Sequence, residues 1–103
     1  MALFGLVDTS KLEEFAATLA DDLARRFPPA SESRTDVGAQ NQLRIIMEGL
    51  SARALRFHNE NKLGVYKKAK LANVFKWRLK EAGYSQVFIE KVTKDLVTQL
   101  AVR

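Results

Sequence analysis

The stretch VYKKAKLANVFKWRLK, residues 65–80, combines positive charge with aromatic rings. It contains six lysine or arginine residues, no aspartate or glutamate, and the aromatic residues Tyr66, Phe75 and Trp77. Lysine and arginine displace counterions from phosphate groups, and aromatic faces stack on unpaired bases. These residue types therefore suit a surface that binds nucleic acid. The same charge would also attract an acidic protein.

Helical spacing sorts this stretch into two opposite faces. One set is expected to face the core: Val65, Ala72, Phe75, Leu79 and Ala82. The other set follows steps of four and three residues: Tyr66, Lys70, Asn73, Trp77 and Lys80. Lys68 falls within the core stripe, so either the first turn frays or the lysine stem lies along the core with its head in water. Trp77, the only tryptophan, is predicted to point away from the core, beside lysines.

The candidate binding surface extends from this second set to nearby cations. Its residues are Arg53, Arg56, Lys62, Tyr66, Lys67, Lys70, Asn73, Lys76, Trp77, Arg78 and Lys80. In this hypothesis the cations contact phosphates, and the two aromatic rings stack on bases or wedge between them. DNA and RNA are not distinguished by the pattern. In the alternative, Trp77 packs under the N-terminal arm or a neighbouring helix, and the lysines form an ordinary solvated face.

The charge is unevenly distributed along the chain. Residues 1–52 carry a net charge of −3 and residues 53–103 a net charge of +8. Such polarity gives one side of the molecule a positive field that attracts polyanions. It also allows the acidic half of one chain to meet the basic half of another. A second hypothesis is therefore a protein–protein interaction module, either a homodimer or an adaptor for an acidic partner.

Catalysis is not indicated by any residue pattern. His58 is the only histidine and the chain has no cysteine, so a nitrogen or sulfur metal cluster has no ligand set. The acidic pairs Glu13–Glu14 and Asp21–Asp22 are better explained as a solvated helix face, with Asp21 pairing with Arg25 one turn later. The five glycines are scattered and form no phosphate-binding loop. We expect no catalytic residues, no metal site and no cofactor.

Length and composition predict one small globular domain. The chain has 103 residues, of which 47% are hydrophobic and 28% charged, values typical of a folded domain with a modest core. No apolar run approaches the roughly 18–20 residues that span a bilayer, and the short apolar start lacks signal-peptide features. We therefore expect a cytoplasmic protein without membrane insertion. The absence of cysteine permits a reducing compartment.

Four helices are expected to position the candidate surface. They cover about residues 10–27, 36–60, 65–82 and 86–101, preceded by an apolar arm at 1–8. Ser10 and Glu13 have capping-box spacing, while Gly83 and Ser85 are suited to end the third helix and cap the fourth. The fold class is all-α, as a four-helix bundle or an orthogonal helical array.

The second helix has apolar residues on two sides. Its main stripe consists of Leu43, Ile46, Met47, Leu50, Ala54 and Phe57, and its other side carries Ile45, Ala52 and Leu55. A helix of this kind is usually central or half of an interface. A helix-turn-helix is weakly suggested by Leu79, Gly83 and Ile89, but the following helix is poor in base-reading side chains. A plain helical hairpin is the favoured interpretation there.

Overall fold

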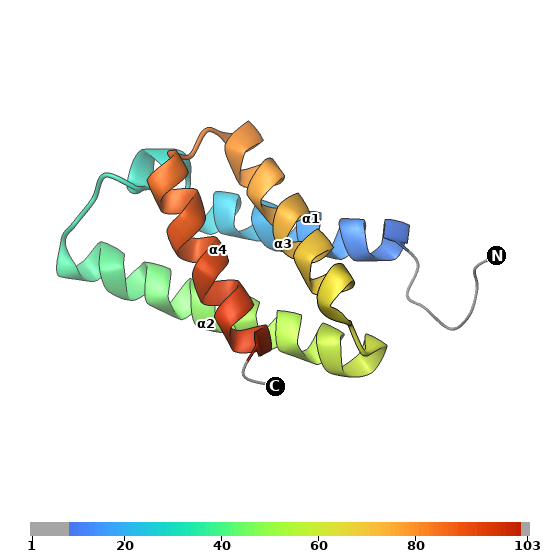
Figure 1. Ribbon diagram of the computed structural model, residues 1–103. Coiled ribbons are helices and arrows are strands. Elements are labelled where there is room, and N and C mark those ends of the chain that lie inside the picture. Colours follow the sequence, from blue (N-terminus) through green and yellow to red (C-terminus); the bar gives the residue numbers. More distant parts are fainter. Residues whose placement is uncertain (1–8, 102–103) are drawn as a thin grey trace.

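The computed structural model describes residues 9–101 and is all-α, as predicted (Figure 1). The elements are α1 (Thr9–Arg26), the short 3-10 turn η1 (Pro29–Ser31), α2 (Val37–Asn61), α3 (Val65–Ala82) and α4 (Gln86–Ala101). No strand occurs in this part of the chain. Observed and predicted helix ends differ by at most one residue. The expected N-terminal arm, residues 1–8, lies outside the described residues.

Local capping interactions fix the helix ends. The Asp36 carboxylate accepts a hydrogen bond from the Ala39 N–H at 3.0 Å and caps α2. Gly83 ends α3 with a φ of 107°, a left-handed conformation that glycine adopts without steric cost. Ser85 Oγ accepts from the Phe88 N–H at 3.2 Å and caps α4. Ser10 does not have the expected N-cap position, because α1 already begins at Thr9.

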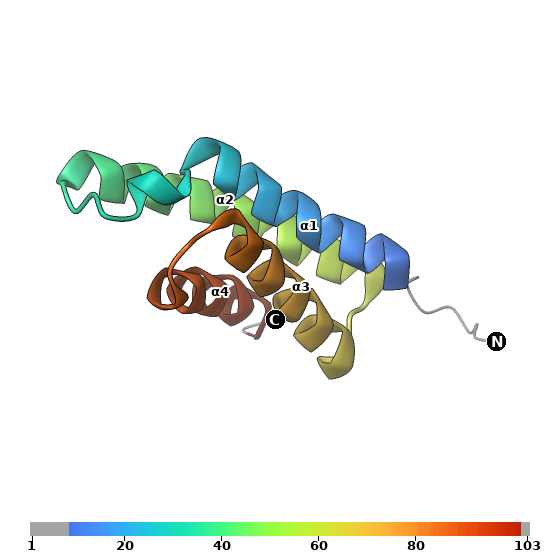
Figure 2. The same cartoon turned by 90° about the horizontal axis from the view of Figure 1, so that it is seen from above.

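The four helices form two layers that cross at an angle. Figures 1 and 2 show α1 and α2 on one side of the molecule and α3 and α4 on the other. Helix α3 packs mainly on α1, and α4 packs on both α2 and α3. Contacts between α1 and α2 are fewer. The face seen in Figure 1 is therefore the outer side of α3 and α4.

The core lies between these layers and contains the predicted main stripe of α2. On α4, the buried residues are Phe88, Ile89, Val92, Thr93, Leu96 and Leu100. All six predicted core residues of α2 are buried. Leu12, Ala16, Leu19 and Leu23 of α1 are buried, as is Phe27 directly after it. Phe15 is half-buried and stacks on Phe57 with ring centroids 4.1 Å apart.

The predicted core stripe of α3 is wrong at both ends. Val65 is 86% exposed and Ala82 is also exposed, whereas Leu71, which the prediction omitted, is fully buried with Phe75 and Leu79. Because α3 crosses its neighbours at an angle, only its central turns are covered. The buried residues are four positions apart. Side chains at this spacing form a ridge on the helix surface, and such ridges interdigitate where two helices cross.

A polar contact joins the α3–α4 connection to the end of α1. The Tyr84 hydroxyl donates to the Phe27 carbonyl, and the Tyr84 ring stacks on Phe88 with centroids 4.7 Å apart. Burial, with a smaller contribution from the negative charge of Glu32, raises the pKa of Tyr84 to about 12. The hydroxyl therefore stays protonated and able to donate at physiological pH.

Candidate nucleic-acid interface

The two aromatic rings on the outer side of α3 are exposed. Trp77 is 57% and Tyr66 75% exposed, so both rings lie off the core face, as helical spacing predicted. Among residues 9–101, no neighbouring helix covers Trp77. Since 11 residues separate the two rings, they lie about 16 Å apart along the helix axis. They therefore form two separate contact points.

A small pocket surrounds Trp77 between α3 and the start of α4. It has a volume of about 170 Å³. Its lining residues, called here the Trp77 surface, are Asn73, Lys76, Trp77, Lys80, Gln86 and Ile89. Lys80 Nζ lies 5.4 Å from the centroid of the Trp77 ring, within the range of a cation–π contact. The lining contains two lysines, two amides and no carboxylate.

Several predicted surface cations are instead paired with carboxylates of α1. Arg78 contacts Asp21 at 2.8 Å and Lys70 contacts Glu13 at 3.1 Å. These pairs link basic α3 to acidic α1, so part of the charge polarity is satisfied within the molecule. Within residues 9–101, Lys76 and Lys80 form no ion pair. Two cations without a carboxylate partner among the described residues therefore lie next to Trp77.

Asp22 is the centre of a second charge cluster. Its side chain is 10% exposed and lies 3.0 Å from Arg53 of α2 and 3.5 Å from Arg26. Arg25 also pairs with Asp22, which corrects the predicted pairing of Arg25 with Asp21 and the placement of Asp22 on a solvated face. Arg53, predicted to contact phosphate, therefore joins α2 to α1.

The remaining predicted residues lie toward the α2–α3 turn. Arg56 is exposed near the end of α2, and Lys62 ends α2 in a left-handed conformation with a φ of 53°. Lys67 is half-buried. These residues are near Tyr66 in the sequence and distant from Trp77 along α3. The structure thus gathers only Asn73, Lys76 and Lys80 of the predicted set around the Trp77 ring.

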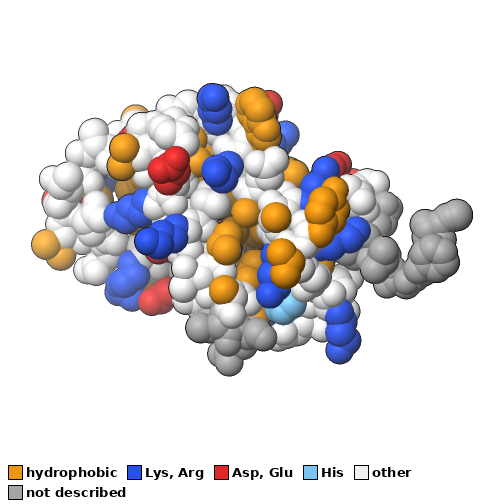
Figure 3. Space-filling model, in the orientation of Figure 1, with side chains coloured by type: hydrophobic (Ala, Val, Ile, Leu, Met, Phe, Trp, Pro, Cys, Tyr) orange, Lys and Arg blue, Asp and Glu red, His pale blue; other side chains and the backbone are white. Residues whose placement is uncertain are grey.

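The outer face of α3 and α4 mixes positive and apolar side chains. Figure 3 shows lysine and arginine side chains beside hydrophobic ones over this face, with few acidic groups among them. Lys68 is half-buried, with Nζ donating to the Leu100 carbonyl at 3.3 Å. Its stem therefore follows the core and its head reaches the end of α4, the second of the two expectations for this lysine.

His58 is half-buried beneath this region. Its Nδ1 is buried without a hydrogen-bond partner among the described residues. Burial, followed by the positive charge of Lys68, holds the pKa of His58 below its usual value. The ring is therefore neutral at physiological pH. No group of histidine, aspartate or glutamate residues within 9–101 has the arrangement needed to hold a metal ion.

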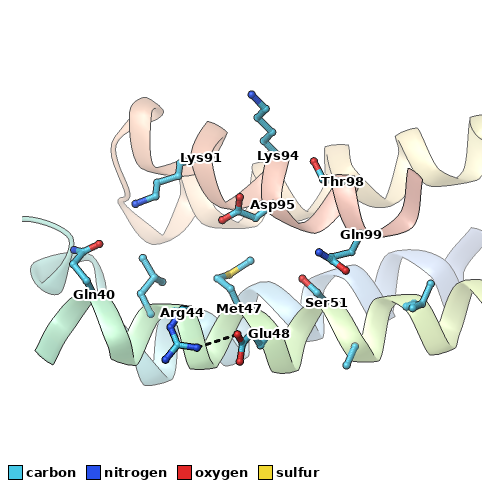
Figure 4. Close-up of a pocket in the computed structure, with 13 residues that line it drawn as sticks. Gln40, Arg44, Met47, Glu48, Ser51, Lys91, Lys94, Asp95, Thr98 and Gln99 are labelled. Atoms are coloured by element: carbon cyan, nitrogen blue, oxygen red, sulfur yellow. Dashed lines mark hydrogen bonds and ion pairs between the residues drawn. The ribbon is translucent and has the colours of Figure 1, made fainter. Parts of the chain in front are cut away.

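A larger concave region, not predicted from the sequence, lies between α2 and α4. It is a groove of about 670 Å³. The residues of this α2–α4 groove are Gln40, Leu43, Arg44, Met47, Glu48, Ser51, Ala52, Leu55, Lys91, Lys94, Asp95, Thr98 and Gln99 (Figure 4). The available signal was the second apolar side of α2, to which Ala52 and Leu55 belong.

Comparison with family models, curated proteins and solved structures finds no match to this chain. None of the helices in residues 9–101 combines the length and the hydropathy needed to cross a membrane.

Proposed function

We propose that this protein is a non-enzymatic nucleic-acid-binding protein that uses the Trp77 surface. The observation that carries the proposal is an exposed tryptophan beside two lysines, Lys76 and Lys80, that have no carboxylate partner in the described structure. Packing among residues 9–101 leaves Trp77 57% exposed. Base stacking on the ring and phosphate contact by the lysines would use every part of this arrangement.

Single strands are the expected ligand class. An exposed ring can stack on a base only when that base is not already stacked between its neighbours. Asn73 is exposed and the Gln86 side-chain oxygen is not engaged by its bond to Glu90, so both amides can meet a base edge. Insertion of α3 into a duplex groove is less well supported, because Lys70 and Arg78 are paired with α1.

The lysines and the ring are expected to act together. Lys80 Nζ lies over the Trp77 ring, 5.4 Å from its centroid, so its ammonium group could contact a phosphate of a nucleotide that is bound at the ring. Arg53, Lys70 and Arg78 instead stabilise the packing of α1, so we assign them no direct phosphate contact. The binding surface proposed here is thus smaller than the set suggested by the sequence.

Fluorescence titration tests the proposal directly, since Trp77 is the only tryptophan. Mixed-sequence oligonucleotides, single- and double-stranded, are added at low and high salt. We expect saturable quenching by the single strand at low salt and loss of quenching at high salt, because phosphate contacts release counterions. An emission that no oligonucleotide changes, together with no binding by anisotropy of a labelled oligonucleotide, would exclude the proposal.

A matched pair of double variants assigns the site. Lys76→Gln/Lys80→Gln should weaken single-strand binding by about fiftyfold at 50 mM salt and reduce the salt slope by about 1.4, as expected for two lost phosphate contacts. Lys91→Gln/Lys94→Gln removes the same charge from exposed positions of α4 and should have little effect. Equal losses in the two variants would mean that binding follows net charge and that the Trp77 surface is not the site.

Trp77→Ala complements this comparison. It should weaken binding roughly tenfold or more, because stacking on an aromatic side chain contributes about 1–3 kcal/mol per base. Trp77→Phe should retain part of the affinity. Both variants are followed by anisotropy of a labelled oligonucleotide, since the intrinsic fluorophore is lost.

A further inference from the structure

The α2–α4 groove has an apolar floor. Leu43 and Met47 are almost buried within it, at 5% and 6% exposure, and Leu55 is half-buried. Ala52 is exposed at its edge. The floor therefore continues the core outward along one side of the contact between α2 and α4. A helix with an apolar face can fill such a space.

The rim of the groove carries both signs of charge on both helices. Helix α2 contributes Arg44 and Glu48, which pair at 3.0 Å. Helix α4 contributes Lys91, Lys94 and Asp95. Figure 4 shows Asp95 and Gln99 extending toward α2 and Lys94 extending away from it. Each side of the groove thus presents a cation next to a carboxylate.

This mixed rim discriminates among occupants. The carboxylates Glu48 and Asp95 among these cations make the rim less suited to a polyanion than a uniformly positive surface, and a uniformly acidic helix would meet Asp95. A two-fold symmetric contact instead requires a surface that is complementary to itself, so that cations of one copy meet carboxylates of the other. The α2–α4 groove has both signs of charge in its lining, as such a contact requires, whereas the lining of the Trp77 surface has cations alone.

We propose that the α2–α4 groove binds a second copy of this chain, with α2 of each copy lying against the groove of the other. The second apolar side of α2, with Ala52 and Leu55, would then be covered in the dimer. Apolar contact over the floor would provide most of the affinity, and the charged rim would fix the orientation of the two copies. This contact leaves the Trp77 surface free on both copies.

Sedimentation equilibrium of the full chain, from micromolar to millimolar concentration, tests the proposal. We expect a reversible monomer–dimer equilibrium in the wild type. Ala52→Arg should weaken the dimer by about a hundredfold, because it places an unpaired charge in the buried contact. Since Ala52 is exposed in the monomer, the variant should keep its helical circular dichroism and its unfolding transition.

Ala69→Arg is the matched control, as Ala69 is an exposed alanine of α3 outside the groove. It should dimerise like the wild type. A wild type that remains monomeric over the whole range would overturn the proposal. So would a dimer that Ala52→Arg leaves intact, or one that both arginine variants weaken equally.

Discussion

The Trp77 surface and the α2–α4 groove lie on the same small fold and differ in the charged and apolar groups that they expose. The Trp77 surface presents cations without carboxylates around one exposed ring, in a pocket of about 170 Å³. The groove presents both signs around an apolar floor, in about 670 Å³. The first arrangement favours a polyanion, and the second favours a complementary protein surface.

This difference does not follow from total charge. Part of the positive charge of α2 and α3 is paired with α1, through Arg53, Lys70 and Arg78. The two regions differ in the local balance of positive and negative charge that remains after these ion pairs are formed. Salt should therefore separate them, because it weakens phosphate contacts strongly and apolar contacts hardly at all.

The largest effect should come from the core that the two regions share. Phe75→Ala removes a fully buried ring of α3 and should lower the free energy of unfolding by about 3–5 kcal/mol. Oligonucleotide binding and self-association should then fail together as the temperature rises, since small domains unfold as one unit. Urea unfolding followed by Trp77 fluorescence and by circular dichroism checks this. Two transitions at different urea concentrations would show that the regions are separately stable.

An intermediate effect on single-strand binding is expected when a cation of α3 without an ion pair is replaced, and a smaller one when a paired cation is replaced. Lys80→Gln should weaken single-strand binding by roughly five- to tenfold at 50 mM salt, the size expected for one lost phosphate contact. Arg78→Gln breaks an exposed ion pair with Asp21 and should change affinity by less than about twofold and stability by about 0–1 kcal/mol. Anisotropy titrations of both variants, side by side, make the comparison. A larger loss for Arg78→Gln would mean that Arg78 leaves Asp21 to contact the ligand.

The smallest effect should come from His58, which lies away from both regions. Because its pKa is lowered in the folded state, the unfolded chain takes up the proton first as the pH falls. Stability should therefore be highest above the ordinary histidine pKa of about 6.5 and decrease below it. The urea midpoint, measured between pH 7.5 and pH 5.5, should fall in the wild type and stay nearly constant in His58→Gln. A fall of the same size in both proteins would assign the pH dependence to other groups.

The sequence predicted the helices well because their ends are set by local chemistry. Asp36, Gly83 and Ser85 act within a few residues of their own positions, and the outward direction of Trp77 follows from helical periodicity alone. The contacts that failed prediction are tertiary. The pairing of Arg78 with Asp21 joins positions 57 residues apart, and the burial of Leu71 in place of Val65 depends on where helices cross. The groove likewise depends on the tertiary packing of α4 against α2.

The interleaved packing of the two layers has a consequence for how the chain acquires its structure. Helix α1 packs mainly against α3 and makes few contacts with α2. During synthesis the first two helices therefore emerge before most of the surface that covers their apolar stripes, and few contacts other than Phe15 on Phe57 join them. Most of the core can form only after α3 and α4 have been synthesised.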